Sequence, residues 1–237
     1  SSVWGTLKDG STVLIPNDQL GKNSGGINIV PEAQNNQTRI PNSNIAYCVS
    51  GFSKCYDPIA GSINNLLLSN GYINYQQGSG QKIGVMYFEA HGGEAEINGE
   101  KVFGLTTSTV ADSEARRKYY NDALAGRVMY VFQTPEEKRL YPECATDFSY
   151  ISVTDRFFRH YASFDKNSFV FINGCKSNNA LLRNAFKDKG ASLYVGWNEN
   201  VDINVAFRAA GTLITGLMGD QKNIRSLNWK AIQAEIN

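Results

Sequence analysis

The chain has 237 residues, of which 42% are hydrophobic and 19% charged, and its formal net charge is +1. This composition excludes a disordered chain, which would be poorer in apolar residues and more highly charged. The balanced charge excludes a polybasic nucleic-acid binder, and four cysteines are too few for a disulfide-dense scaffold. The length suits one large core or two small domains.

The first 44 residues are rich in Gly, Asn, Ser and Pro, which predicts loops more than a packed core. Residues 12–15 and 27–30 are the short strand candidates within them. We therefore expect residues 1–44 to form an N-terminal extension or edge strands, and residues 45–237 to form the main domain.

From residue 45 onward, apolar segments of strand length alternate with amphipathic segments of helix length. Residues 82–90 and 168–172 are almost continuously apolar, as expected of parallel strands buried on both faces. The other predicted strands are residues 45–49, 72–75 and 193–197. The predicted helices are residues 59–69, 112–125, 152–163, 178–189, 201–218 and 224–236. Residues 106–150 are polar and predict an excursion from the core. The order predicts an α/β fold with a mainly parallel sheet flanked by helices.

Three further observations concern a hairpin turn, the membrane and metal ions. Asn98-Gly99, in the middle of residues 94–105, is a strong signal for a two-residue hairpin turn. No membrane span is expected, because the apolar run 83–90 is too short and the run 205–219 contains Arg208. The scattered histidines and cysteines lack the spacing of metal ligands, so the sequence predicts neither a metal nor a cofactor.

The chain contains only two histidines, His91 and His160, and both precede Cys175. An α/β-hydrolase requires a G-x-S-x-G nucleophile elbow followed by a histidine, and a papain-like enzyme also has its histidine after the cysteine. Chain order therefore excludes both classes. A chymotrypsin-like enzyme has the histidine first, but its barrels would not contain the predicted helix 178–189 directly after the cysteine. His160 lies within a predicted helix and is expected to have a surface or packing role.

The remaining arrangement is a cysteine–histidine dyad at the ends of adjacent parallel strands. His91 follows the strand 82–90 and Cys175 follows the strand 168–172, and neighbouring strands lie roughly 4.8 Å apart. We expect Cys175 to lie at a helix N-terminus, which favours a thiolate, and His91 to act as the base that later protonates the leaving amine. The N–H of Gly92, together with that of Cys175, would form an oxyanion hole.

A hydrophobic strand ending in His-Gly, a hairpin, a helix and a second hydrophobic strand ending in Cys175 resemble the caspase-like cysteine peptidases. This clan includes caspases, metacaspases, legumain, clostripain, gingipains, separase and CHAT-domain proteases. Residues 189–197 (KGASLYVGW), followed by Asp202 and an Ala-rich helix, are most similar to the CHAT and gingipain type. The resemblance covers about residues 45–220. It implies a three-layer sandwich and an endopeptidase that forms a thioester acyl-enzyme on Cys175 with help from His91.

The resemblance also implies a specificity pocket near the cysteine. The residue two positions before the cysteine often lines that pocket, and it is acidic in clostripain and legumain but is Asn173 here. This departure argues against a strong preference for Arg or Lys. Glu199 and Asp202 would then be the acidic candidates, and Trp197 and Tyr194 would wall the pocket. The simpler interpretation is that Trp197 belongs to the core and that the two acids cap the following helix.

The sequence is also compatible with functions that need no catalysis. Cys175 and His91 could belong to a catalytically silent caspase-like module that binds peptides or proteins, or to a plain α/β binding domain. The basic residues 116–118 and 138–139 are most simply charged side chains exposed to solvent. The resemblance to caspase-like enzymes, which commonly cleave themselves between the His and Cys strands, makes them alternative self-cleavage sites. Cys48 and Cys55 could close a small disulfide loop, with Cys144 also unassigned. An Asn-rich, Lys-poor surface slightly favours a secreted or periplasmic bacterial protein.

Overall fold

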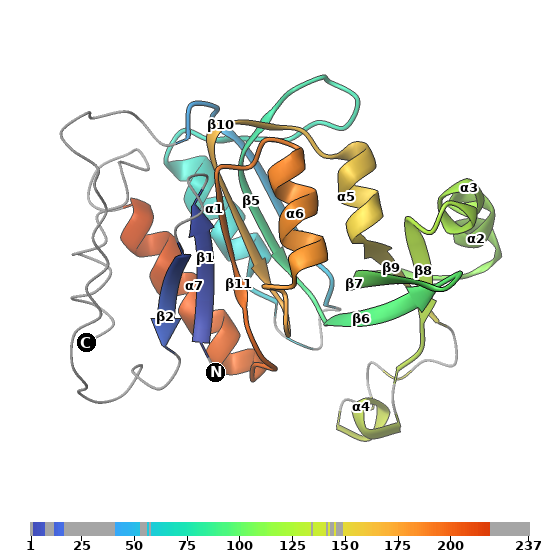
Figure 1. Ribbon diagram of the computed structural model, residues 1–237. Helices are drawn as coiled ribbons and strands as arrows, with labels where there is room; N and C mark the ends of the chain where they lie inside the picture. The colour runs from blue at the N-terminus through green and yellow to red at the C-terminus, as the bar shows by residue number, and fades with distance from the viewer. Residues whose placement is uncertain are drawn as a thin grey trace.

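The computed structural model describes residues 2–7, 12–16, 41–52, 56, 58–133, 135–140, 142, 145 and 149–218. These residues form an α/β protein with a seven-stranded sheet and a separate four-stranded antiparallel sheet (Figure 1). The predicted strand at residues 27–30 and the predicted helix at residues 224–236 lie outside the described residues. None of the helices in the described part of the chain is long and apolar enough to cross a membrane.

The larger sheet has five parallel strands and an antiparallel pair at one edge, in the order β2-β1-β11-β10-β5-β3-β4. The parallel strands are β3 (Ile45–Ser50), β4 (Ile73–Asn74), β5 (Ile83–Glu89), β10 (Phe164–Asn173) and β11 (Leu193–Trp197). The edge pair is β1 (Ser2–Leu7) and β2 (Thr12–Pro16), and β1 pairs with β11. The N-terminal residues therefore supply edge strands, of which β1 was not predicted.

Alternate residues of the central strands enter two different cores. On β5, Val85 and Tyr87 face the first core, whereas Met86 and Phe88 face the second. Helices α1 (Ala60–Ser69) and α7 (Ile203–Met218) complete the first core, and α5 (Asp155–Tyr161) and α6 (Ala180–Asp188) contribute to the second. Helices thus cover both faces of the sheet (Figure 1), and all seven residues of β5 are buried, as the apolar run predicted.

The smaller sheet follows β5 directly in the chain and has the order β6-β7-β9-β8. Its strands are β6 (Gly92–Ile97), β7 (Glu100–Val110), β8 (Val128–Val131) and β9 (Tyr150–Thr154). Asn98 and Gly99 have φ values of 55° and 80°, the left-handed geometry that a two-residue hairpin turn requires. The predicted hairpin is therefore confirmed. The connections on either side of β8 contain α2 (Ser113–Lys118), α3 (Tyr120–Leu124) and α4 (Pro135–Leu140).

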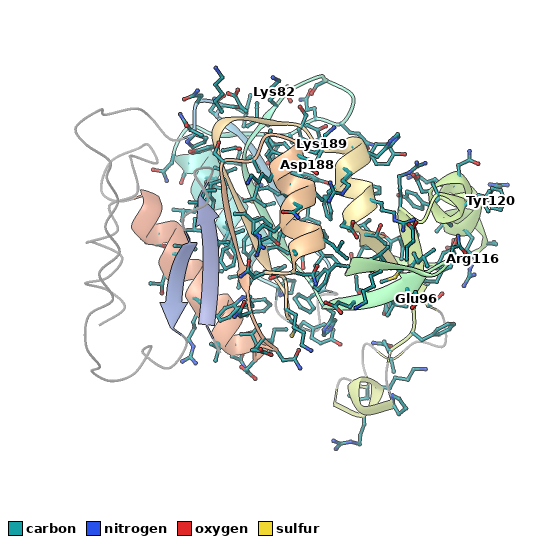
Figure 2. The ribbon with its side chains drawn as sticks, in the orientation of Figure 1. Lys82, Glu96, Arg116, Tyr120, Asp188 and Lys189 are labelled. Carbon is teal, nitrogen blue, oxygen red and sulfur yellow. The ribbon has the colours of Figure 1, made fainter. Side chains whose placement is uncertain are left out.

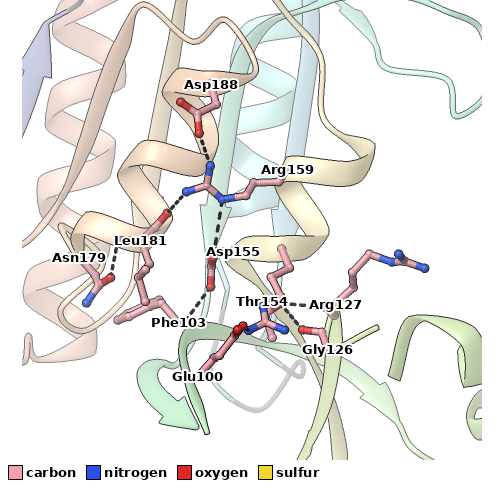
Figure 3. Close-up of polar contacts among 11 residues, drawn as sticks. Glu100, Phe103, Gly126, Arg127, Thr154, Asp155, Arg159, Asn179, Leu181 and Asp188 are labelled. Carbon is pink, nitrogen blue, oxygen red and sulfur yellow. Dashed lines mark hydrogen bonds and ion pairs between the residues drawn. The ribbon is translucent and has the colours of Figure 1, made fainter. Parts of the chain in front are cut away.

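The predicted helix at residues 152–163 is wrong in its first part, because β9 occupies residues 150–154 and α5 begins at Asp155. The aromatic residues that follow have helical spacing, and this pattern does not separate the short strand from the helix. Asp155 marks the boundary: its buried carboxylate accepts a hydrogen bond from the Phe103 N–H of β7 at 2.9 Å (Figure 3). The same carboxylate pairs with Arg159 one turn later, at 3.9 Å. The hydrogen bond from Phe103 therefore ties the start of α5 to the second sheet.

The interpretation of residues 106–150 as a polar excursion with some helix is confirmed only in part: α2 and α3 contain no buried residue, but other residues of the segment belong to the second sheet. This segment contains β8 and the ends of β7 and β9, and Val128 and neighbouring Ile151 are buried in the second core. The helix predicted at residues 112–125 is divided into α2 and α3. The second sheet is therefore an integral part of the structure, packed against α5 and α6.

Candidate active site

The strands that carry His91 and Cys175 are neighbours in the larger sheet. β5 and β10 pair in parallel, and their last register partners are Glu89 and Asn173. The Ala90 N–H donates to the Asn173 carbonyl at 3.2 Å, so the pairing extends one residue further. His91 and Cys175 each follow the last register partner by two residues. The predicted placement of the two residues at the ends of adjacent parallel strands is confirmed.

Glycines allow the two strand ends to approach each other closely. A Cβ atom on Gly174 would lie 2.5 Å from the Ala90 carbonyl oxygen, and one on Gly92 would lie 2.7 Å from the Cys175 carbonyl oxygen. Both distances are too short for any side chain, and the obstructing atoms belong to the backbone. The sequences His91-Gly92 and Gly174-Cys175 therefore bring the main chains beside the two candidate residues into contact.

The side chains of Cys175 and His91 both lie near the start of α7. The Cys175 sulfur accepts a hydrogen bond from the Val201 N–H at 3.4 Å, and its thiol is directed at the Val201 carbonyl at 3.7 Å. The His91 ring packs edge-on against Phe52, with centroids 4.8 Å apart, and Phe52 packs against Phe207 of α7 at 5.9 Å. Both side chains therefore emerge on the face of the sheet that α1 and α7 cover.

The N–H of Gly92 points away from β7. The Thr106 N–H donates to the His91 carbonyl at 2.9 Å, which makes Gly92 and Leu105 a non-hydrogen-bonded pair of the antiparallel ladder. In such a pair the N–H groups are directed to the outer side of each strand. The ladder therefore leaves the Gly92 N–H on the side from which an oxyanion could approach.

Cys175 does not lie at a helix N-terminus, which corrects one expectation. Helix α6 begins only at Ala180, and the Asn179 side chain caps it by accepting from the Leu181 N–H at 2.8 Å. The intervening turn includes Lys176 with a φ of 53°. A helix dipole acts mainly within its first turn, so the dipole of α6 is not available to stabilise a thiolate at Cys175. The backbone N–H that reaches the sulfur belongs to Val201 instead.

Beneath the two strand ends, buried side chains from three neighbouring strands form a continuous chain of hydrogen bonds. The Trp197 indole N–H donates to Asn173 Oδ1 at 2.7 Å, and the Asn173 amide donates to Tyr87 Oη at 3.0 Å. The Tyr87 hydroxyl donates to Glu89 Oε2 at 2.8 Å. The Ala60 N–H, at the first turn of α1, donates to Glu89 Oε1 at 3.0 Å. The chain therefore connects β11, β10, β5 and α1.

This buried network corrects the expectation that Asn173, Trp197 and Tyr194 wall a specificity pocket. The three residues are 2%, 0% and 3% exposed. Asn173 and Trp197 bond to each other, and the Tyr194 hydroxyl donates to the Ser177 carbonyl at 2.5 Å. Their polar atoms are used inside the protein, and no side of them is open to a substrate. Trp197 belongs to the core, in agreement with the simpler interpretation.

Burial controls the ionisation of the groups around Glu89. It raises the pKa of the Glu89 carboxyl, although the hydrogen bonds from Ala60 and Tyr87 oppose the increase. Burial also raises the pKa of the neighbouring Cys48 thiol to about 12, and the charge of Glu89 adds to this effect. Cys48 is a free thiol, which argues against the possibility that it is part of a disulfide loop. Cys55 and Cys144 lie outside the described residues.

The two acidic candidates after β11 are exposed but have different settings. Asp202 caps α7, because its Oδ1 accepts from the N–H groups of Asn204 at 2.9 Å and Val205 at 3.3 Å. The Glu199 carbonyl accepts from the Lys176 N–H at 3.0 Å, which places Glu199 beside the turn that follows Cys175. Glu199 therefore lies close to Cys175 in the fold, whereas the carboxylate of Asp202 is engaged as a cap.

A pocket of about 140 Å³ opens beside His91, between the end of β3 and the second sheet. It is lined by Gly51, Phe52, Tyr56, His91, Thr106, Thr107, Val131, Phe132, Gln133 and Tyr150. Of the two predicted reactive residues, only His91 lines it. The pocket was not predicted from the sequence, although one signal was present: residues directly after β3 reach the same sheet edge as residues directly after β5.

The remaining candidates from the sequence are not part of the site. His160 is exposed on α5 and packs against Tyr161, with ring centroids 4.5 Å apart. Arg116 lies over the Tyr130 ring at 4.4 Å and donates to Ser149, so it is bound to the second sheet. Within the described ranges, no group of three or more His, Cys, Asp or Glu side chains is arranged to hold a metal ion.

Comparison with known proteins gives no match: no family model, no curated protein and no solved structure is significantly similar to the chain. The geometry at the ends of β5 and β10, and the motifs that these strands carry, are therefore the basis for a proposed function.

Proposed function

We propose that the protein is a cysteine endopeptidase of the caspase-like type, with Cys175 as the nucleophile and His91 as its base and acid. The observation that carries the proposal is the register of β5 and β10, which places the two residues at equivalent positions on adjacent strand ends. A nucleophile and its base must lie within hydrogen-bond reach of each other, and adjacent strand ends are an arrangement that can bring them there. The proposed substrate is a peptide or protein, and the proposed reaction needs no cofactor.

In the proposed reaction, the Cys175 thiol gives its proton to His91, and the sulfur attacks the carbonyl carbon of the scissile peptide. The N–H groups of Gly92 and Cys175 stabilise the resulting oxyanion. The C–N bond then breaks as His91 returns the proton to the leaving amine, and a thioester remains on Cys175. A water molecule, deprotonated by His91, attacks the thioester and releases the carboxylic acid and the thiol.

Several features of the fold support a caspase-like assignment. The parallel sheet is covered by helices on both faces, a β-hairpin follows the histidine-bearing strand, and the cysteine follows the next strand of the sheet. The buried Asn173 and Trp197 distinguish this chain from relatives that have an acid two residues before the cysteine. Glu199, beside the turn after Cys175, is the acidic residue that we propose for substrate contact on the acyl side.

A second candidate function is a caspase-like module without catalysis. The observation that favours it is the environment of the Cys175 sulfur, which bonds with the N–H and carbonyl of Val201. A thiol held in this way could have a purely structural role. This second function predicts that Cys175 does not react with electrophiles and that the protein cleaves no peptide.

The experiment compares Cys175→Ala with Cys48→Ala, because both cysteines are free thiols and half-buried. We expect iodoacetamide to modify Cys175 before Cys48, whose pKa is raised to about 12. We expect Cys175→Ala to abolish cleavage of a denatured protein substrate, and Cys48→Ala to retain it. His91→Ala should lower the rate by roughly 10²-fold or more. Cleavage that persists in Cys175→Ala would contradict the proposal.

A further inference from the structure

The surface of the pocket beside His91 is mostly apolar and includes several aromatic rings, with Thr106, Thr107 and Gln133 as its uncharged polar residues. Among the described residues, none of the ten that line it is Asp, Glu, Lys or Arg. Phe52 and Tyr56 present their rings to His91, with centroids 4.8 and 5.7 Å from the imidazole. On the opposite side, Val131 and Phe132 at the end of β8 complete the wall, and Phe132 is 65% exposed. The pocket is thus built from two sheets and opens to solvent past Phe132.

The position of the pocket relative to the two proposed catalytic residues assigns it to one side of the scissile bond. In the reaction proposed above, Cys175 bonds to the acyl carbon, whereas His91 delivers a proton to the leaving amine. The amine side of the substrate must therefore pass His91. Since the pocket borders His91 and not Cys175, a side chain that enters it belongs to the amine side.

We propose that this pocket binds the side chain of the first residue after the scissile bond and selects an apolar or aromatic one. The inference rests on the proposed peptidase function and adds a substrate preference to it. The volume of about 140 Å³ is close to that of an engineered apolar cavity of about 150 Å³ that binds benzene. A phenylalanine or leucine side chain therefore fits.

The same pocket disfavours charged side chains. A carboxylate or ammonium group that enters it loses water and finds no Asp, Glu, Lys or Arg among the described lining residues to neutralise it. The Thr107 hydroxyl already donates to the Ile151 carbonyl at 2.8 Å, so its proton is not available to a carboxylate. Selection on the amine side is therefore expected to depend on apolar contact with Phe52, Val131 and Phe132.

The test uses the full chain and a library of peptides randomised at every position. The new amino termini that appear during cleavage are labelled and sequenced, which reports the first residue after each scissile bond. We expect Phe, Tyr, Leu, Ile and Met to exceed Asp, Glu, Lys and Arg by about tenfold at that position, as apolar pockets typically discriminate. The Phe132→Ala variant should reduce this ratio at least twofold.

The matched control is Tyr120→Ala. Tyr120 is an aromatic residue of α3 that is 59% exposed, and Figure 2 shows it at the far end of the second sheet. We expect Tyr120→Ala to keep the ratio of the unmodified protein. Circular dichroism and thermal unfolding check that both variants fold, which is expected because both side chains are largely exposed.

The outcomes separate the two proposals. Cleavage without any preference at the first residue after the scissile bond, or a ratio unchanged by Phe132→Ala, would overturn the pocket assignment and leave the peptidase proposal intact. A preference for apolar residues only before the scissile bond would also overturn it. Absence of any cleavage would overturn the proposed function and the pocket assignment together.

Discussion

Asn173 has a single possible orientation, and this fixes the direction of the buried hydrogen-bond chain. The Trp197 indole offers only a donor and the Ala206 carbonyl only an acceptor, so Asn173 turns Oδ1 to the first and its amide to the second. The amide also donates to Tyr87, whose own proton then goes to Glu89. Glu89 is the end point of the chain, and it lies two residues before His91.

A buried carboxyl at this end point makes folding stability depend on pH. The folded pKa of Glu89 lies above its ordinary value of 4.5 because of burial, so the folded state binds the proton more tightly. Its contribution to stability is complete below pH 4.5 and is lost as pH rises through the folded pKa. Neighbouring Cys48 and Tyr87 do not titrate in this range, because burial raises the pKa of both, to about 12 for Cys48.

We therefore expect Glu89→Gln to remove the contribution of Glu89 to the loss of folding stability as the pH rises. The free energy of unfolding, measured by urea denaturation from pH 4.5 to 8, should fall with pH more steeply in the unmodified protein than in the variant. The difference in slope cannot exceed about 1.4 kcal/mol per pH unit for one group. Tyr87→Phe is the comparison: it removes a donor that lowers the pKa of Glu89, so the decline should extend to higher pH. Parallel profiles for all three proteins would contradict the assignment.

At the scale of elements, the decisive feature is the close approach of three backbone segments at the sheet edge. β5, β10 and β6 meet there, and Gly92 occupies the position where a Cβ would lie 2.7 Å from Cys175 and 3.2 Å from the Phe103 ring. Gly93, the next residue of β6, has no atom within 4 Å of the equivalent position. Adjacent glycines in one strand therefore have different roles.

This difference predicts different effects of the same substitution. Gly92→Ala should lower the free energy of unfolding by about 1–3 kcal/mol, the usual cost of an added group in a packed site. Gly93→Ala should be neutral or stabilise by up to about 1 kcal/mol, because alanine reduces the entropy of the unfolded chain. Chemical denaturation of the two variants provides the measurement. Equal stability of the pair would show that the Cys175 backbone is free to move aside.

The elements that could be predicted from the sequence are those whose hydrophobic pattern directly reflects their burial in the fold. The apolar runs of β5 and β10 must be buried on both faces, so their adjacency and the positions of His91 and Cys175 followed from the sequence. Beyond its β6–β7 hairpin, the second sheet could not be predicted, because β8 has only four residues and the alternation of β9 runs directly into a helical pattern. A core position for Trp197 was one of the two interpretations of the sequence, but its hydrogen bond to Asn173 could not be predicted, since it depends on the packing of neighbouring strands and of α7.

For the molecule as a whole, the second hydrophobic core is shared by the two sheets. Met86 and Phe88 of the larger sheet and Phe103 and Leu105 of the smaller sheet belong to the same buried cluster as α5 and α6. The ion pair between Arg159 and Asp188 also joins α5 to α6 (Figure 3). Among the described residues, the smaller sheet therefore has no hydrophobic core separate from that of the larger sheet, and the pocket between the sheets is part of a single unit.

A substitution at Phe186 of α6 tests whether the two sheets unfold together. Its ring packs against Phe158, Phe164 and Tyr194, with centroids 4.6, 5.7 and 5.5 Å away. Phe186→Ala should lower the free energy of unfolding by about 3–5 kcal/mol through loss of burial and the cavity it leaves. Hydrogen exchange should then show equal losses of protection in β5 and β9, because both depend on the shared core. Leu124→Ala, at a side chain that is 65% exposed on α3, is the control and should change neither strand. Loss of protection in β9 alone would show that the second sheet unfolds separately from the larger sheet. The pocket beside His91, which residues of both sheets line, would then open when the second sheet unfolds.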